Sequence, residues 1–403
     1  MNIKLVNILE VADIVSGSTP KGIDDLNTIE GNVPFFRVGD MNTKGNEIFM
    51  YEAVINLTSS SAAKLKLKLC RAGTVVFPKR GGAIFTNKKR KLSQVSAFDL
   101  NTMGLVPNEK VENEYFYYWF NSLDLGHLAN GSSVPQLNNK QISPLSIPLP
   151  PLDQQKKIAA ILDAADAYRK KTKALIVKYD ELTQSLFLDM FGDPVGNPKG
   201  WKVNNLKNIS NKIHSGNTPK GGSKVYVDEG ITFFRSQNVW KNRIVYDDVV
   251  FIDQATHDKM LKSSLKHRDI LMTKTGRINT ENSSLGRAAM YLGEDDQANV
   301  NGHVYLIRLN EGVLNEFVLH ILTTKQYRGH IRRVCVGGID KRQLNKGHIE
   351  DFPIISPPID MQENFISRLL LMKQHKDKLK ASLAQAEDLF NSLLQKAFKG
   401  ELV

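Results

Sequence analysis

Cysteine is scarce in this sequence, and long apolar runs are absent from it. Only two cysteines, Cys70 and Cys335, occur among 403 residues, and they lie far apart. A disulfide framework or a cysteine-ligated metal site needs more cysteines at closer spacing, so we expect neither and predict a reducing, cytoplasmic compartment. No run of about eighteen apolar residues occurs, and the first residues do not resemble a secretory signal, so we predict no membrane span.

Sequence motifs of the common enzymes are also missing. A methyltransferase that acts on an exocyclic amine usually carries Asn/Asp-Pro-Pro-aromatic, but the one Asp-Pro pair is Asp193-Pro194, which we place in a turn that ends a helix. There is no His-Glu-x-x-His, no Cys-x-x-Cys and no Gly-x-Ser-x-Gly, and the nine histidines have no metal-ligand spacing. We therefore predict no catalytic residue, no metal and no cofactor bound by this chain.

Positive charge is in excess. The chain has 54 Lys and Arg against 42 Asp and Glu, a formal net charge of +12 at pH 7. Such an excess favours polyanionic partners, DNA or RNA first and an anionic membrane second. The alternative is a protein kept apart in solution by self-repulsion. With 41% hydrophobic residues, a chain of this length can form two packed domains.

The chain repeats itself. Several stretches recur in the same order about two hundred residues later, which chance does not explain, so we infer a tandem duplication. The matched pairs are SGSTPKG (16–22) with SGNTPKG (215–221), PFFR (34–37) with TFFR (232–235), TVVFPKRG (74–81) with DILMTKTG (269–276), and QLNNKQISPLSIPLPPLDQQKKI (136–158) with QLNKGHIEDFPIISPPIDMQENF (343–365).

The repeated SG.TPKG stretch is not a phosphate-gripping P-loop. That motif needs a second Gly followed directly by Lys and then Ser or Thr. Here Lys21 and Lys220 precede the second Gly, and Pro20 and Pro219 each remove an amide donor. We predict a tight turn that presents Lys21 and Lys220 to a nucleic-acid backbone.

Each half divides into a strand-rich part and a helix. Short apolar and β-branched runs such as TVVFP and VYLIRL, broken by Gly, Asn and Asp, predict strands with a few helices between them. Residues 153–191 and 360–398 contain no Gly or Pro and predict one long helix each. The fold class is α+β, with globular parts at 1–152 and 193–359 and long spacer helices at 153–192 and 360–403.

Both helices carry a stripe of residues at heptad spacing, which must be buried against another helix. The other copy is the simplest partner, and because the chain has to return from the second globular part, we predict an antiparallel coiled coil. The alternative is that each helix packs only on its own globular part. The predicted seam consists of Ala165, Tyr168, Thr172, Leu175, Tyr179, Leu182 and Leu186 in the first helix, and of Met372, His375, Leu379, Ser382, Ala386, Leu389 and Leu393 in the second.

Basic and amide side chains follow several strand-like runs, where loops would present them. Lys and Arg neutralise phosphates, Arg can fork onto guanine, and Asn or Gln onto adenine. For any single residue a solvated surface charge is the alternative, and spacing does not separate base from phosphate contacts. The candidate DNA-binding residues are Lys21, Arg37, Lys79, Arg80, Lys88, Lys89 and Arg90 in the first half, and Lys220, Arg235, Gln237, Asn238, Lys274 and Arg277 in the second.

Three features make the chain similar to the specificity subunits of type I restriction–modification enzymes. They are the half-repeat SG.TPKG…FFR…QLN…P.PP.DQQ..I, the long helix after it, and the stretch LTQSLFLDMFGDP.GNPKGW. The resemblance covers essentially the whole chain. It implies that each globular part is a target recognition domain that reads one half of a split double-stranded DNA site, and that the helices form an antiparallel coiled coil that spaces them. The second junction, ISPPIDMQENFI, departs from LPPLDQQKKI after the Asp, a difference that can alter how the second helix engages a partner.

The resemblance also implies a subunit without catalysis. Two methyltransferase subunits, which use S-adenosylmethionine to methylate adenine, are expected to dock on the helices and adjoining surfaces, and translocating restriction subunits to join them for cleavage. Two other functions stay open, a methyltransferase or nuclease with degenerate motifs and a coiled-coil scaffold that binds only protein. The basic positions carried over from the family are Lys21, Arg37, Lys79, Arg80, Lys220, Arg235, Lys274 and Arg277.

Overall fold

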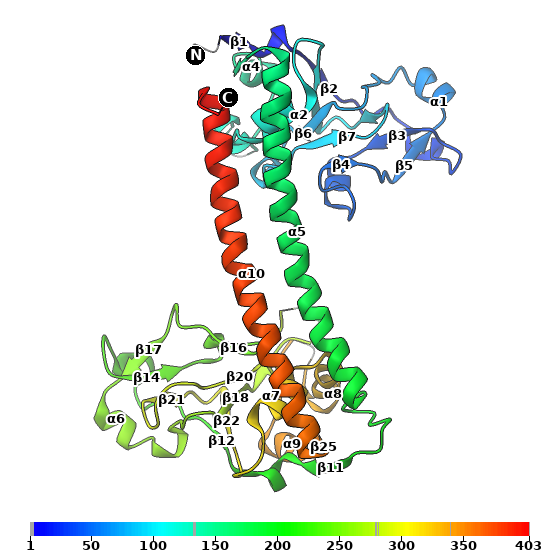
Figure 1. Cartoon of the computed structure of the whole chain (residues 1–403). Helices are drawn as coiled ribbons and strands as arrows, with labels where there is room; N and C mark the ends of the chain where they lie inside the picture. Colours follow the sequence, from blue (N-terminus) through cyan, green and yellow to red (C-terminus); the bar gives the residue numbers. More distant parts are fainter. Residues whose placement is uncertain (1–3, 132–133, 279, 281, 339, 403) are drawn as a thin grey trace. The chain divides into compact units, whose positions relative to one another are not determined.

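The computed structural model describes residues 4–131, 134–278, 280, 282–338 and 340–402. Backbone contacts divide the chain into two units: unit 1 is Met1–Ala174 with Leu379–Val403, and unit 2 is Leu175–Lys378. Each unit combines a globular part with a segment of each of two long helices, α5 (Leu152–Phe191) and α10 (Ile359–Lys399) (Figure 1). Because both units include part of each helix, the predicted domain boundaries stay a prediction. Among the described residues, no helix is both long and apolar enough to span a membrane.

The globular part of unit 1 is α+β, as predicted. Its strands are β1 (Leu5–Asn7), β2 (Ala12–Ser16), β3 (Val33–Phe36), β4 (Phe49–Met50), β5 (Ile55–Leu57), β6 (Val75–Pro78), β7 (Arg90–Leu92), β8 (Ala97–Phe98), β9 (Thr102–Pro107) and β10 (Ser146–Pro148). Its helices are α1 (Ser59–Lys64), α2 (Asn113–Asn121), α3 (Leu125–Leu128) and α4 (Asn139–Ile142). The strands form a five-stranded sheet in the order β2-β9-β6-β7-β4, a three-stranded sheet in the order β5-β3-β8, and the pair β1-β10.

The globular part of unit 2 has the same class of fold. Its strands are β11 (Lys202–Asn205), β12 (Ser210–Ser215), β13 (Tyr226–Val227), β14 (Ile231–Phe234), β15 (Val239–Trp240), β16 (Arg243–Ile244), β17 (Val250–Ile252), β18 (Ile270–Thr273), β19 (Thr275–Gly276), β20 (Ala288–Met290), β21 (Ala298–Val300), β22 (Val304–Leu309), β23 (Val336–Gly337), β24 (Arg342–Gln343) and β25 (Pro353–Ser356). Its helices are α6 (Gln254–Asp258), α7 (Asn315–Thr323), α8 (Lys325–Val334) and α9 (Lys346–Glu350).

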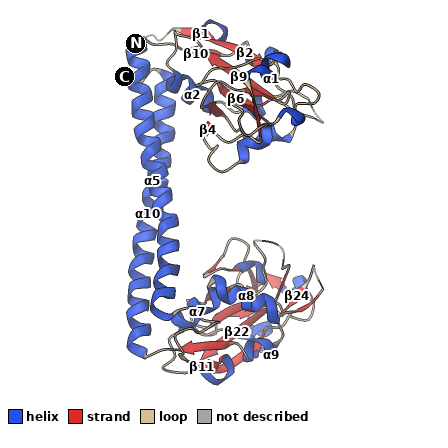
Figure 2. Ribbon diagram, turned by 90° about the vertical axis from the view of Figure 1, so that its right-hand side faces the viewer, coloured by secondary structure: helices blue, strands red, loops and turns tan. Residues whose placement is uncertain are grey.

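Strand pairing confirms the tandem duplication. Figure 2 shows strands and helices in both globular parts. The order β2-β9-β6-β7 of unit 1 recurs in unit 2 as β12-β22-β18-β20. The order β5-β3-β8 recurs as β17-β14-β21, and in both units the last pair is parallel while the first is antiparallel. The pair β1-β10 recurs as β11-β25. The matched sequence stretches therefore occupy matched places in two copies of one topology.

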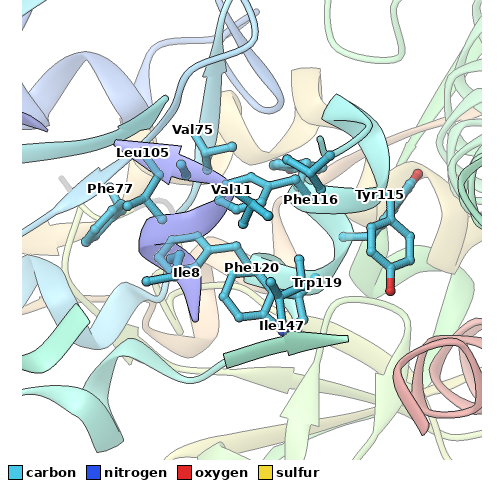
Figure 3. Packing of buried hydrophobic residues seen from close by; sticks show 14 of the residues in the cluster. Ile8, Val11, Val75, Phe77, Leu105, Tyr115, Phe116, Trp119, Phe120 and Ile147 are labelled. Atoms are coloured by element: carbon cyan, nitrogen blue, oxygen red, sulfur yellow. The ribbon is translucent and has the colours of Figure 1, made fainter. Parts of the chain in front are cut away.

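Aromatic residues of α2 form the centre of the main core of unit 1. All six residues from Tyr115 to Phe120 are buried, which is unusual for a helix and places it between the sheet and the long helices. On one side the helix meets Val75 and Phe77 of β6 (Figure 3). On the other side the hydroxyl of Tyr118 donates to Oδ1 of Asp163 on α5 at 2.6 Å. Each fully buried aromatic of this kind contributes about 1.5–3 kcal/mol, so this helix joins α5 and α10 firmly to the sheet.

An aromatic cluster does the same in unit 2. Phe187 and Phe191 of α5 lie 6.1 and 5.1 Å, between ring centres, from Phe317 of α7. Phe365 of α10 lies 5.4 and 5.6 Å from the same two α5 rings. His320, one turn after Phe317, completes the cluster, and burial lowers its pKa to about 4. The matched helices α2 and α7 thus anchor the long helices in both copies.

The two long helices begin and end within one residue of the predicted bounds, 153–191 and 360–398. At the N-termini, matched side-chain amides of Gln155 and Gln362 donate to the carbonyls of Pro150 and Pro357, each at 2.8 Å. At the C-terminus of α5, Gly192 has φ +77°, a left-handed conformation that favours glycine and ends a helix. The absence of Gly and Pro between these signals leaves nothing to interrupt either helix.

Within each unit the α5 and α10 segments run antiparallel, as predicted. In unit 1 the Tyr168 hydroxyl and Ser382 Oγ are 2.9 Å apart. In unit 2 the rings of Tyr179 and His375 stack with centres 6.3 Å apart. Within unit 2, Tyr179 of α5 meets His375 of α10 and Phe187 meets Phe365, so the residue number falls along α10 as it rises along α5, which is the register of an antiparallel pair.

The predicted seam is buried only in part. Thr172 and Ala386 are buried, whereas Leu182 is 51% exposed and Leu389 is 54% exposed. The prediction of one continuous buried stripe is wrong at these two leucines and at the other exposed seam positions. The reason is that the helix segments of each unit also pack on the globular part of that unit, which the seam pattern alone did not include. The remaining seam residues are half-buried at Ala165, Tyr179, Leu186, Met372, Leu379, Ser382 and Leu393, and exposed at Tyr168, Leu175 and His375.

Candidate nucleic-acid interface

Matched basic residues follow the matched strands β6 and β18. The backbone N–H of Lys79 donates to the carbonyl of Asn101 at 2.8 Å, and the Lys79 carbonyl accepts from the N–H of Leu137 at 2.8 Å. At the matched place in unit 2, the N–H of Lys274 donates to the carbonyl of His303 at 2.8 Å, and its carbonyl accepts from Leu344 at 2.9 Å. In both units the leucine of the repeated QLN stretch therefore hydrogen-bonds to the residue after β6 or β18 and holds the backbone that carries the lysine.

The side chains at these strand ends differ in their surroundings. Lys79 is half-buried, and burial together with the neighbouring charge of Arg80 lowers its pKa. Arg80 is exposed. In unit 2 the ammonium of Lys274 lies 5.8 Å from the centre of the Tyr305 ring, and Arg277 is exposed. Each unit thus presents at least one exposed arginine beside a partly shielded lysine.

The repeated SG.TPKG stretches are tight loops, as predicted, and their glycines have a steric role. A Cβ on Gly17 would lie 2.1 Å from the carbonyl oxygen of Asp99, and one on Gly216 would lie 2.0 Å from that of Val300. No side chain fits at such a distance, so only glycine allows this close backbone approach. The loops leave Lys21 and Lys220 exposed, available to a polyanion.

The arginines after the matched FF stretches are paired with acids. Arg37 donates through Nη2 to Oδ1 and Oδ2 of Asp24 at 2.7 and 2.9 Å. Arg235 donates through Nη2 to Oδ2 of Asp248 at 3.2 Å, and the exposed Gln237 donates to the same oxygen at 2.6 Å. Both arginines are partly exposed and hold a defined position at the surface.

Asn238 is not a base-contacting residue, so that prediction is wrong. Its side chain is fully buried. Its oxygen accepts from the backbone N–H of Arg235 at 2.8 Å, while its Nδ2 donates to Oδ1 of Asp248 at 2.8 Å and to the Val245 carbonyl at 3.1 Å. Every polar group of the amide is used inside the protein, which leaves none for a base edge.

The basic block 88–91 is mostly internal, which corrects a second prediction. Lys89 is 1% exposed, and its ammonium donates to Oδ1 of Asn87 at 2.8 Å and to the Leu123 carbonyl at 2.5 Å. Burial lowers the pKa of Lys89 to about 8. Lys91 is also buried, 4.6 Å from the centre of the Tyr117 ring, and pairs with Glu114. The sequence shows four like charges, but the carbonyls, carboxylate and ring faces that receive them come from distant segments.

The two remaining members of the block have internal partners as well. Arg90 is partly buried, and its guanidinium donates to the carbonyls of Lys89 at 3.0 Å and Met41 at 3.5 Å. Burial lowers the pKa of Arg90. Lys88 donates to Oδ1 of Asn42 and is half-exposed. Of this block, only Lys88 keeps an ammonium within reach of an outside partner.

Sequence reasoning missed a basic helix in unit 2. In α8 the residues Tyr327 and Ile331 are buried, and Lys325, Arg332 and Arg333 are exposed. Arg328 is used internally, donating to the carbonyls of Gly286 at 3.2 Å and Leu285 at 3.3 Å. The signal was present as Tyr327 and Ile331 four residues apart between basic residues, a pattern typical of a helix with one buried face and one basic face.

The chemistry of the described residues does not suggest a metal centre. No group of three or more His, Cys, Asp or Glu among them is placed to hold a metal ion. Both cysteines are buried and free, and burial raises the pKa of Cys70 to about 11, which disfavours a reactive thiolate.

Comparison with known proteins supports the resemblance read from the sequence. Residues 2–178 match the family model of the type I restriction modification DNA specificity domain. The chain is 22% identical to the type I restriction enzyme MjaIX specificity subunit of Methanocaldococcus jannaschii, over 98% of this chain and 92% of that protein. Among solved structures it is similar to a chain of a type I R-M system described for its complex assembly and conformational transition (TM-score 0.59, 16% identity, 99% of this chain and 98% of that one) and to the S subunit of M. genitalium (TM-score 0.52, 17% identity, 98% and 96%). These likenesses show the fold.

Proposed function

We propose that the chain is a specificity subunit of a type I restriction–modification enzyme and that it recognises a split DNA site, one half with each globular part. The relatives it matches are named as specificity subunits rather than as methyltransferases or nucleases. The chain accordingly supplies sequence recognition and no catalysis. Methylation of adenine, with S-adenosylmethionine as the methyl donor, belongs to partner subunits.

One observation carries this proposal. Two copies of one topology present basic side chains at matched places, namely the SG.TPKG loop, the residue after the FF strand and the end of β6 or β18. Exposed lysines such as Lys21 and Lys220 suit phosphate contact, which gives affinity without sequence preference. The side chains around Arg37 and Arg235 differ between the copies, which suits two readers of different half-sites.

We further propose that the helices set the gap between the half-sites and dock two methyltransferase subunits, with restriction subunits joining the assembly. Exposed apolar side chains on the helices support the docking role: Val177 is 53% exposed, Leu370 49% and Leu371 55%. Apolar residues that neither helix partner nor globular part covers are typical of a surface that another subunit covers. A rigid spacer would also strengthen DNA binding, because two linked readers gain from each other only when both engage at once.

Sequencing of methylated adenines tests the proposal. The chain is expressed with its methyltransferase partner in a host without adenine methylation. We expect methylation in a motif of two short specific blocks with an unread gap near one helical turn of DNA. A single contiguous motif would contradict the two-reader proposal.

The purified chain separates the competing functions. Incubated with DNA, Mg²⁺ and S-adenosylmethionine, it should neither methylate nor cut the DNA, and turnover by the chain alone would favour the enzyme class. A mobility shift of duplex DNA at low salt is expected from a DNA-binding subunit. Its absence would favour a scaffold that binds only protein.

A further inference from the structure

Arg37 in unit 1 and Arg235 in unit 2 occupy the same place, after matched strands, but they pair with different acids. Arg37 follows β3 and Arg235 follows β14. In each case the backbone N–H of the arginine donates at 2.8 Å to the side chain three residues later, Asp40 in unit 1 and Asn238 in unit 2. The backbone that carries the guanidinium is therefore held in the same way in both copies.

The residue three positions after the arginine differs between the two units, an acid in unit 1 and an amide in unit 2. Asp40 is buried, and as a carboxylate it can only accept hydrogen bonds. A second carboxylate beside it would be repelled, and the acid that binds Arg37 is Asp24, which comes from a 3₁₀ turn (Asp24–Leu26) that precedes the strand.

Asn238 has the opposite capacity, because its Nδ2 is a donor. It donates to Oδ1 of Asp248 and so holds that carboxylate beside Arg235. Asp248 lies in the segment that follows β16. Unit 2 has no acid at the place that matches Asp24 of unit 1. The two units therefore differ both at this buried position, Asp40 or Asn238, and in the acid that pairs with the arginine, which precedes Arg37 but follows Arg235 in the chain.

Asp248 accepts hydrogen bonds from both polar side chains of this surface, Arg235 and Gln237. Its Oδ2 accepts from Gln237 Nε2 at 2.6 Å and from Arg235 Nη2 at 3.2 Å, and its backbone carbonyl also accepts from Arg235 Nη2. The hydrogen bond from Gln237 is the largest cause of the lowered pKa of Asp248, with a smaller contribution from Arg235. The group is therefore an ionised acceptor at neutral pH.

We propose that Asp248 is a positioning residue that holds Arg235 and Gln237 as one fixed reading pair for the bases of a half-site. This inference rests on the proposed function. An Arg can fork onto guanine and a Gln onto adenine, but only when each side chain is aimed at the base edge. Arg235 uses Nη2 for Asp248 and keeps the donors of Nη1 for DNA, while Gln237 is exposed beside it and keeps its amide oxygen. The acid partner, rather than the arginine itself, then decides what the common position reads in each copy.

The neighbouring residue, Asp247, provides a matched control for substitution of Asp248. Asp247 is exposed in the same loop and has no hydrogen bond or ion pair to another described residue. Asp247→Asn removes one negative charge at nearly the same place as Asp248→Asn. Any effect of charge alone on phosphate attraction is therefore common to both variants, and only Asp248→Asn disturbs the pair.

The test is selection from a duplex library randomised in both half-sites, using the chain in complex with its methyltransferase partner. For Asp248→Asn we expect base discrimination at one or two adjacent positions of one half-site to fall by about tenfold. The other half-site should keep its preference, which also reports that the chain is folded. Asp247→Asn should keep the wild-type profile, and Asp248→Glu, which restores the carboxylate, should regain part of the preference.

Two outcomes would overturn the inference. One is an Asp248→Asn profile identical to that of Asp247→Asn. The other is tighter binding of all sequences alike, which would mean that Asp248 masks Arg235 instead of aiming it. A double variant provides a second check: adding Asp248→Asn to Arg235→Ala should relax the affected position no further. If the wild-type complex itself selected no bipartite sequence, the proposed function would fail, a result distinct from either of these.

Discussion

Leu389 and Phe390 are neighbours on α10. The heptad pattern and the structure disagree on which of the two is buried. The heptad pattern places Leu389 on the buried seam and leaves Phe390 off it. In the structure Phe390 is 5% exposed and Leu389 is 54% exposed. The ring centre of Phe390 lies 6.0 Å from that of Tyr118 on α2 and 4.4 Å from the guanidinium carbon of Arg169 on α5.

We predict that Phe390→Ala lowers the free energy of unfolding by about 3–5 kcal/mol. The substitution removes a buried ring and leaves a cavity that α2, a helix packed on both sides, cannot fill by collapsing. The contact of Arg169 with the ring face is lost as well and contributes about 0.5–1 kcal/mol of that total. Leu389→Ala removes a side chain that is already half in water, so it should cost less than about 1 kcal/mol.

Urea unfolding of the two variants, followed by circular dichroism at 222 nm and by tryptophan fluorescence, measures both effects. Trp119 lies in α2 beside Tyr118, so its emission reports on the core that Phe390 enters. A larger loss of stability for Leu389→Ala than for Phe390→Ala would restore the heptad seam as the main contact of this part of α10. It would refute the packing of α10 on α2.

Three other predictions concern charge and spacing. Lys89 has a folded-state pKa of about 8 against 10.5 in an unperturbed lysine. Between these values the unfolded chain binds a proton that the folded chain has lost, so the contribution of Lys89 to the free energy of unfolding should rise with pH from 8 to 10.5. The difference between wild type and Lys89→Met, measured by urea unfolding across that range, checks the sign. Lys21→Ala should lower DNA affinity equally for all sequences and reduce the salt slope by about 1, as a phosphate contact would, whereas Arg235→Ala should cost about 1–3 kcal/mol and relax one base position. Titrations at several salt concentrations on specific and scrambled duplexes separate the two. Insertion of residues inside α5 and α10 should change the gap and leave both half-site sequences as they are, and methylome sequencing would contradict the spacer role if the bases read changed while the gap did not.

The sequence was sufficient to predict the order of the globular parts and the long helices along the chain. Repeats in one order predicted two copies of one topology, and the strand pairing bears this out. The two long helices follow from local signals, the absence of Gly and Pro between Asp153 and Phe191 and the left-handed glycine after them. Such signals depend on backbone propensity and steric limits that act within a few residues, so they can be read without knowing the fold.

The candidate interface depended on contacts between distant segments. Lys89 looks like a surface charge in the sequence, but its ammonium lies against the Leu123 carbonyl and the Phe120 ring, which come from residues more than thirty positions away. Asn238 looks like a base reader, but its amide is used up by Arg235, Val245 and Asp248. Composition and spacing carry no information about such partners.

By itself, the sequence determined the duplication, the helices, the resemblance to the specificity subunits and the matched positions of Lys21, Arg37, Lys220 and Arg235. Only the tertiary structure decided which polar side chains face outward, that Asp248 rather than an acid matched to Asp24 holds Arg235, and that Phe390 is buried in place of Leu389. The physical reason is that backbone periodicity is a local property. The burial of a charge or a ring instead depends on which distant groups can solvate it or pack against it, and the fold brings those groups together.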